Sequence, residues 1–174
     1  MKRIIFSLIL FINISSLAQE EPFYEQIAFD FYSTKIIDSF PVRKKIRVYK
    51  YFFDFQNSIE INFNVPNCMK KNVKFEKIEE YCKEQSKIES KKFEINYSKL
   101  NKKKFKIRKS VKEKYPRLFI TAPHRIVDEK EKNIFINIHV EESLFFKSIY
   151  HLKLNDKGQI LNWCRDFFET IIIH

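Results

Sequence analysis

The chain has 174 residues, a formal net charge of +11 and 44% hydrophobic residues, but it contains only one glycine, Gly158. Dinucleotide-binding fingerprints, phosphate-binding loops and nucleophile elbows need glycines wherever the backbone turns sharply or approaches a ligand closely. The composition therefore argues against nucleotide-dependent enzymes and α/β-hydrolases.

The first 18 residues have the pattern of a secretory signal peptide. Lys2 and Arg3 give a positive start, an apolar run covers residues 4–14, and the small residues Ser16 and Ala18 end the segment. The apolar run is too short to cross a bilayer, which takes about 20 helical residues. We expect residues 1–18 to be removed, the protein to be exported to the periplasm or the medium without spanning the membrane, and residues 19–174 to form a single globular domain.

The first predicted element of the mature chain is an amphipathic helix. Apolar side chains recur at helical spacing from Tyr24 to Ile36. Pro22 stands where the first turn of a helix tolerates proline, and Pro41 lies beyond the end. This segment therefore predicts a helix with one apolar face, which needs a sheet or another helix to cover it.

Alternating apolar and polar residues predict strands in the rest of the chain. The pattern over residues 45–65 predicts a β-hairpin that turns near Gln56 and Asn57. A short helix over residues 75–85 is expected next, followed by strands over residues 93–97, 105–108 and 118–121.

The C-terminal third alternates most regularly. Residues 134–140 and 146–154 each place apolar side chains on one face, and a turn at Gly158, which can adopt a positive φ, leads into a third strand from Ile160. We expect three antiparallel strands in a meander. Together with the helix, the predicted fold class is α+β, an N-terminal amphipathic helix packed on an antiparallel β-sheet that ends in a three-stranded meander.

A basic segment covers residues 99–117, with ten Lys and Arg residues and one acidic residue, Glu113. Such a concentration is typical of a surface that binds polyanions. For an exported chain we expect an anionic component of the cell envelope or an acidic protein partner, and no nucleic acid. The alternative is a solvated face without a ligand. The candidate binding residues are Lys102, Lys103, Lys104, Lys106, Arg108 and Lys109.

The cysteines are three in number, so that one disulfide would leave one thiol over. We predict the pair Cys68–Cys82, because these residues enclose a short loop whose closure stabilises the fold by about 3 kcal/mol. Cys164 follows Trp163 in an apolar strand, which favours a small buried side chain. The cysteines do not have the spacing of a structural zinc site.

His139 and His151 are predicted on the outward faces of neighbouring strands. In a suitable register they would lie close together, and with Glu141 they would form a His, His, carboxylate set that suits a catalytic metal ion. The alternative is that both are solvated surface side chains. They are the candidate metal ligands of this sequence.

Two stretches, FYEQIAFDFYSTKI and IFINIHV…SIYHLKLNDKGQILNW, resemble small exported proteins of unknown function from flavobacteria and related bacteria. The resemblance implies export into a bacterial envelope and carries no catalytic motif. We therefore predict a non-catalytic binding or structural module of the cell envelope that uses the basic segment and no cofactor. The alternatives are a small envelope hydrolase, with or without a metal, that uses His139 or His151, and an inhibitor or immunity-type protein.

Overall fold

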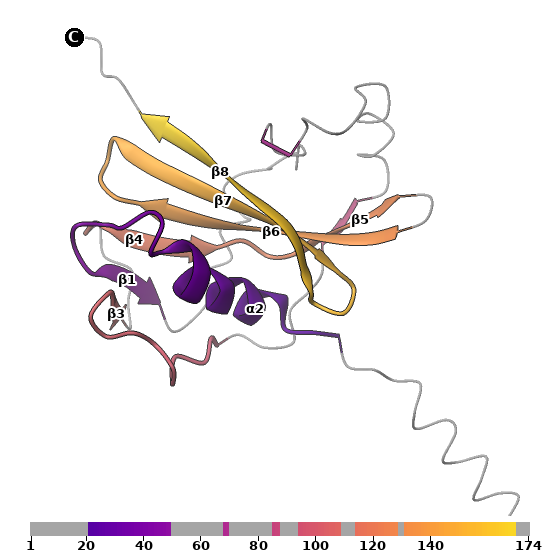
Figure 1. Cartoon of the computed structure of the whole chain (residues 1–174), viewed down its shortest axis with the longest axis horizontal. Coiled ribbons are helices and arrows are strands. Elements are labelled where there is room, and N and C mark those ends of the chain that lie inside the picture. Colours follow the sequence, from indigo (N-terminus) through magenta and orange to yellow (C-terminus); the bar gives the residue numbers. More distant parts are fainter. Residues whose placement is uncertain are drawn as a thin grey trace, which may run out of the picture.

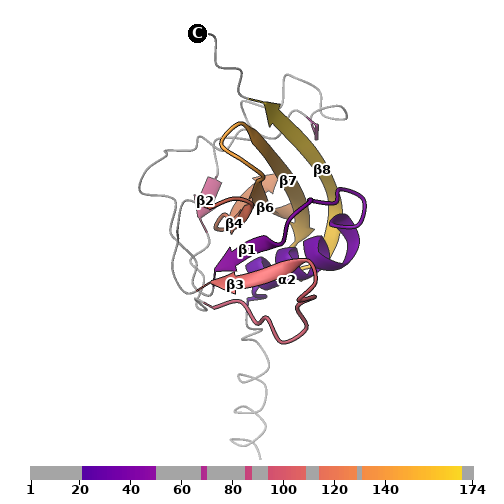
Figure 2. The ribbon, with the colours of Figure 1, turned by 90° about the vertical axis from the view of Figure 1, so that its left-hand side faces the viewer.

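Most of the chain that the structure describes is β-sheet, with one short helical segment on one face (Figures 1 and 2). The computed structural model describes residues 21–49, 68–69, 85–87, 94–108, 114–128 and 131–169. The predicted signal peptide, the hairpin turn at Gln56 and Asn57, Cys82 and Lys109 lie outside these ranges. So does the helix predicted over residues 75–85, except for its last residue, Gln85, which begins a strand instead.

The helical segment comprises α2 (Tyr24–Phe31), an α-helix of 8 residues, and η1 (Tyr32–Ile36), a π-helical turn of 5 residues. One side of the segment is completely buried, at Tyr24, Ala28, Tyr32 and Ile36. The hydroxyl of Tyr24 also donates a hydrogen bond of 2.9 Å to the backbone carbonyl of Asp156. Burial of its aromatic side chains thus holds the segment against the sheet, and this hydrogen bond connects its first turn to residue 156 near the C-terminal part of the chain.

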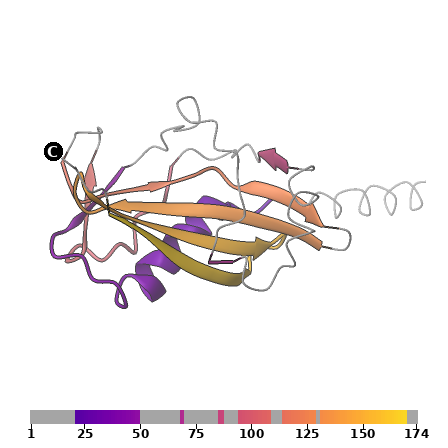
Figure 3. The same ribbon diagram turned by 90° about the horizontal axis from the view of Figure 1, so that it is seen from above.

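Eight strands form one sheet. They are β1 (Ile46–Tyr49), β2 (Gln85–Lys87), β3 (Phe105–Arg108), β4 (Arg117–Ile120), β5 (His124–Asp128), β6 (Glu131–Glu141), β7 (Phe146–Asn155) and β8 (Ile160–Glu169). β6 is central, because β5 and β4 pair with successive parts of one of its edges and β7 pairs with the other. The long strands β6, β7 and β8 run side by side along the molecule (Figure 3).

The predicted fold class is wrong, because the sheet is mixed and the helical segment is short. β1 pairs in parallel with β3 and with β4, whereas the sequence predicted a hairpin in which the strand from residue 45 pairs with its next neighbour. Alternation along a strand shows which side chains share a face, but it does not identify the partner strand. The predicted strand over residues 93–97 is also wrong, since residues 95–97 are not in a strand.

The hydrophobic core lies between α2 and one face of the sheet. β6 contributes Ile134, Ile136, Ile138 and Val140, all with no exposed surface. These residues pair across the strands with Leu154, Leu152, Tyr150 and Ser148 of β7, so the apolar face continues over both strands. The described residues contain no helix with the length and apolarity of a membrane span.

The turn between β7 and β8 depends on the only glycine of the chain. Gly158 has φ of +79°, the positive value that the sequence predicted for this turn. A Cβ atom at this position would lie 2.5 Å from Cδ1 of Ile27 on α2. The turn therefore needs glycine because of its backbone conformation, whereas the end of the Ile27 side chain could move aside for a Cβ atom.

Candidate functional site

The face of the sheet opposite α2 is polar and yet partly closed to solvent. Asn133, Asn137 and His151 are 1%, 7% and 7% exposed, and all three lie on the alternate positions that point away from the helix. Buried polar groups need hydrogen-bond partners, because burying an unpaired group costs about 1–3 kcal/mol. This face is therefore the place to look for specific chemistry.

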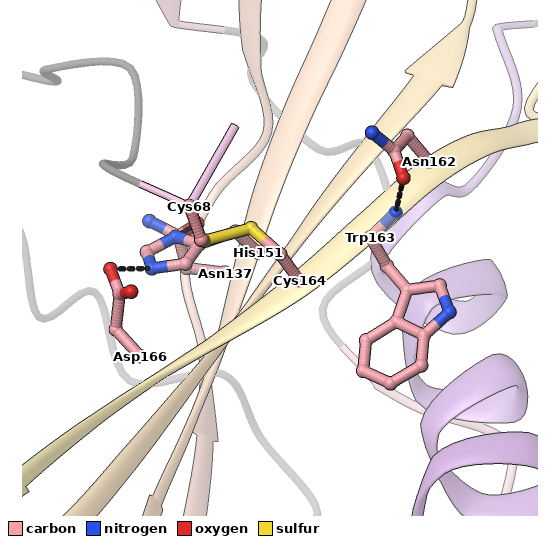
Figure 4. Close-up of a disulfide and its surroundings, with 7 residues drawn as sticks. All are labelled: Cys68, Asn137, His151, Asn162, Trp163, Cys164 and Asp166. Atoms are coloured by element: carbon pink, nitrogen blue, oxygen red, sulfur yellow. Dashed lines mark hydrogen bonds and ion pairs between the residues drawn. A yellow bond between two sulfur atoms is a disulfide. The ribbon is translucent and has the colours of Figure 1, made fainter. Parts of the chain in front are cut away.

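His151 is held between an amide and a carboxylate (Figure 4). Its Nδ1 lies 2.8 Å from Oδ1 of Asn137 on β6, and its Nε2 lies 3.1 Å from Oδ2 of Asp166 on β8. Burial lowers the pKa of His151, while the carboxylate of Asp166 acts in the opposite direction. The ring is therefore fixed in orientation by strands on both sides of β7.

A disulfide lies against this histidine. Cys68 is bonded to Cys164, with a Cα–Cα distance of 6.0 Å, and Cys164 is directly opposite His151 in the pairing of β7 with β8. The Cys68 sulfur, a ring nitrogen of His151 and a carboxylate oxygen of Asp166 all lie within 4.8 Å of one another. We call Cys68, Asn137, His151, Cys164 and Asp166 the His151 cluster.

The predicted disulfide Cys68–Cys82 is therefore wrong, and Cys164 is a disulfide partner rather than a free buried thiol. The prediction ranked pairs by loop length, but the pairing is decided by which cysteine the folded sheet presents. Cys164 and Trp163 are neighbours on β8 whose side chains point to opposite faces (Figure 4). Trp163 packs against the helix side, with its ring 6.4 Å from that of Phe31, which leaves Cys164 on the polar face.

His139 and His151 share the polar face but are not directly opposite. His139 pairs with Ile149, and His151 pairs with Asn137, so the two rings are diagonal neighbours. Burial, helped by Lys147 and His151, lowers the pKa of His139 to about 3, and its Nε2 is buried without a hydrogen-bond partner. The alternative to metal binding was that both histidines are solvated surface side chains. Neither histidine has that environment.

The third member of the predicted metal set, Glu141, has a different partner. Its carboxylate forms an ion pair with Nε of Arg117 on β4. Within the described part of the chain, the residues at metal-ligand distance from His151 are Cys68 and Asp166. Sequence reasoning missed both, because Cys68 comes from a distant segment, Asp166 comes from the next strand, and neither matches a spacing motif.

The basic segment lies beside a second basic stretch, residues 43–45, and the sequence did not predict that the two are neighbours. Because β1 and β3 are parallel, with Ile46 opposite Phe105, residues 43–45 and 102–104 precede their strands at the same end of the sheet. Ile46 N–H donates to the carbonyl of Lys104 at 2.9 Å, which fixes the two stretches side by side. We call the Lys and Arg residues of segments 41–49 and 97–108 the basic region.

The candidate binding residues differ in whether their side chains are exposed or form an ion pair within the protein. Lys102, Lys103, Lys106 and Arg108 are exposed, whereas Lys104 forms an ion pair with Asp38.

On the polar face, charged side chains from five neighbouring strands form a row across the sheet. The row, in order from β3 to β7, is Lys106, Arg47, Arg117, Glu141 and Lys147.

This row has four basic residues and one carboxylate. Like charges directly opposite on neighbouring strands repel each other. Arg117 is compensated by Glu141 and also lies over the rings of Tyr115 and Phe119, at 5.0 and 5.1 Å. The row therefore keeps a surplus of positive charge at the edge formed by β3 and β1.

Comparison of this chain with protein-family models, with curated proteins and with solved structures gives no match. The resemblance to small exported proteins of flavobacteria therefore stays a prediction, and function has to be argued from the geometry.

Proposed function

We propose that this protein is an exported, non-catalytic binding module that attaches to an anionic component of the bacterial cell envelope through the basic region. The observation that carries the proposal is the parallel pairing of β1 with β3. This pairing joins two basic stretches, which together hold ten Lys and Arg residues and no Asp or Glu.

The electrostatic argument follows from this arrangement. Arg47, Lys106 and Arg108 lie on neighbouring strands about 4.8 Å apart. The other charges of the basic region lie in the stretches before these strands, which the hydrogen bond from Ile46 N–H to the carbonyl of Lys104 holds side by side. A concentrated positive surface attracts polyanions over roughly a Debye length of 10 Å at 0.1 M salt. Among the described residues, Asp38 pairs with Lys104, whereas Lys102, Lys103, Lys106 and Arg108 have exposed side chains that can reach a ligand. Attachment by such a surface needs no catalytic group.

Export is supported by two further observations. The first 18 residues have the zones of a signal peptide, and a disulfide joins Cys68 to Cys164. Disulfides persist in oxidising compartments such as the periplasm and are rare in the cytosol. Both observations favour a protein that works outside the cytoplasm.

The test is binding to two anionic probes over a range of salt concentrations. Vesicles that contain phosphatidylglycerol represent a lipid surface, heparin represents an anionic polysaccharide, and phosphatidylcholine vesicles are the neutral control. We expect binding that weakens steeply with salt to at least one anionic probe and none to the neutral vesicles. Absence of binding to both anionic probes at low salt would overturn the proposal.

A pair of matched variants locates the surface. K102Q/K103Q removes two charges from the basic region, and K132Q/K157Q removes two exposed charges elsewhere. The first variant should lower the slope of log affinity against log salt by about 2, because each lost contact releases about one counterion fewer. The second should leave the slope almost unchanged. Equal effects of the two variants would mean that net charge alone, and not the basic region, attracts the ligand.

A further inference from the structure

We propose that reduction of the Cys68–Cys164 disulfide turns the His151 cluster into a binding site for Zn²⁺, with Cys68, Cys164, His151 and Asp166 as the four ligands. The site is separate from the basic region and does not depend on the function proposed above. In the oxidised protein the two sulfur atoms are bonded to each other, so the disulfide and the metal site are alternative states of the same residues.

The ligand atoms are already close to the positions that a zinc ion requires. One atom each from Cys68, His151 and Asp166 lies within 4.8 Å of the other two. In a tetrahedral site with bonds of about 2.0–2.3 Å, ligand atoms are roughly 3.3–3.8 Å apart. The atoms of these three residues therefore have to move by about 1 Å or less, whereas the two sulfur atoms, which share a bond in the disulfide, have to move apart by side-chain rotation.

The fourth ligand is Cys164. It is directly opposite His151 on the neighbouring strand, and its sulfur is bonded to that of Cys68. Breaking the bond frees the sulfur of Cys164, which lies outside the group of atoms within 4.8 Å of one another, to turn toward the imidazole of the opposite strand. Two sulfur ligands, one imidazole and one carboxylate are all ligand types that Zn²⁺ accepts, and four is its preferred number in structural sites.

The orientation of His151 is the strongest support. Oδ1 of Asn137 accepts a hydrogen bond from Nδ1–H at 2.8 Å, so in the neutral ring Nε2 carries the lone pair. That lone pair points at the carboxylate of Asp166, at 3.1 Å. Two acceptors that face each other need a proton or a metal cation between them.

Asn137 would support the metal site by holding the His151 ring rather than by binding the metal itself. A histidine that binds a metal almost always donates its other ring N–H to a carbonyl, a carboxylate or water, which fixes the ring. Asn137 is itself anchored, because its backbone N–H donates to the hydroxyl of Thr121 at 3.0 Å and its carbonyl accepts from Thr121 N–H at 2.9 Å. The ring is therefore held in place before any metal arrives.

The chemical step balances with a dithiol reductant as co-reactant. The dithiol transfers two electrons and two protons, the S–S bond breaks, Cys68 and Cys164 become thiols, and the reductant leaves as its own disulfide. Zn²⁺ then displaces the two thiol protons to solvent as the two Zn–S bonds form.

The test uses Co²⁺ as a spectroscopic probe and Zn²⁺ as its competitor. The full chain is prepared with Cys82→Ser, so that its only thiols come from the disulfide, and is studied before and after reduction with a phosphine. We expect the reduced protein to bind one Co²⁺ with thiolate-to-metal charge-transfer bands, and Zn²⁺ to remove them. No such bands after reduction, or equal bands before it, would overturn the proposal.

Matched variants assign the remaining ligands. H151A and D166N should each weaken Co²⁺ binding by about 100-fold or more, and N137A by about 10-fold, as expected for a supporting residue. H139Q is the control, because His139 lies on the same face outside the cluster. Its affinity should change less than about twofold. Unchanged binding in both H151A and D166N would overturn the assignment.

A second measurement does not depend on whether the variants fold. In the reduced wild-type protein, Zn²⁺ should slow alkylation of Cys68 and Cys164 by about tenfold or more, and a chelator should restore the rate, because only a free thiolate is nucleophilic. Cys82 should react at the same rate with and without Zn²⁺. Protection of Cys82 instead, or of no cysteine, would contradict the proposal.

Discussion

The two faces of the sheet are built in different ways. The face under α2 is apolar and closed by contacts between neighbouring strands and a helix, as at Ile136 and Tyr32, which have no exposed surface. The opposite face carries Asn137, His139 and His151, and a disulfide with a sequence separation of 96 residues attaches Cys68 to it. Hydrophobic burial is non-directional, whereas the polar face depends on specific partners. The apolar face therefore tolerates a change in the shape of a side chain better than a change from apolar to polar. The polar face tolerates a change in polarity better than the loss of a particular hydrogen-bond partner.

The largest expected effect is on the polar face, by removal of the disulfide. Closing a loop of 96 residues stabilises a fold by about 4–5 kcal/mol in the chain-entropy model. C164S should therefore lower Tm by about 10 °C or more in a thermal melt followed by circular dichroism, since about 1 kcal/mol shifts Tm by 2–4 °C at this chain length.

C82S is the control for this experiment, and its Tm should stay close to that of the wild type. If C82S lost as much stability as C68S while C164S lost none, the cysteine pairing described here would be wrong.

A change on the helix side should be nearly as large. Ile136 is completely buried, and I136A leaves a cavity under α2, which should cost about 2–5 kcal/mol in urea unfolding. Leu161 on β8 is 51% exposed, so L161A should cost less than about 0.5 kcal/mol. A similar loss in both variants would mean that the apolar face is not the main source of stability.

The most gradual effect is the pH dependence that His139 gives to the polar face. The pKa of His139 is about 3 in the folded protein and about 6.5 in the unfolded chain. Between these two pH values the unfolded chain therefore binds a proton that the folded protein does not bind. The contribution of this neutral ring to stability is complete above pH 6.5 and is lost as the pH falls toward 3. The loss is at most about 1.4 kcal/mol per pH unit in this window.

H139Q isolates this contribution, because every other titrating group, including His151, is retained. The free energy of unfolding of the wild type should fall more steeply than that of H139Q between about pH 6 and 4. Parallel curves from urea titrations at several pH values would show that the ring is protonated in the folded protein.

Residues with a local role were predictable from the sequence. The positive φ of Gly158 follows from its place in a turn, and the strand pairs β6–β7 and β7–β8 follow from short connections and regular alternation. The burial of Ala28 and Tyr32 follows from helical spacing. In each case the prediction uses one segment or two segments joined by a short connection, so that periodicity and turn chemistry are sufficient.

The tertiary structure decided everything that joins distant segments. The sequence determined that a helix and alternating strands would form, and where the basic residues lie along the chain. It did not determine that β1 would pair in parallel with β3 or that Cys68 would meet Cys164. Pairing between strands that are far apart in the chain, like a cross-link, depends on which surfaces become available after collapse, and local propensity contains no information about that choice.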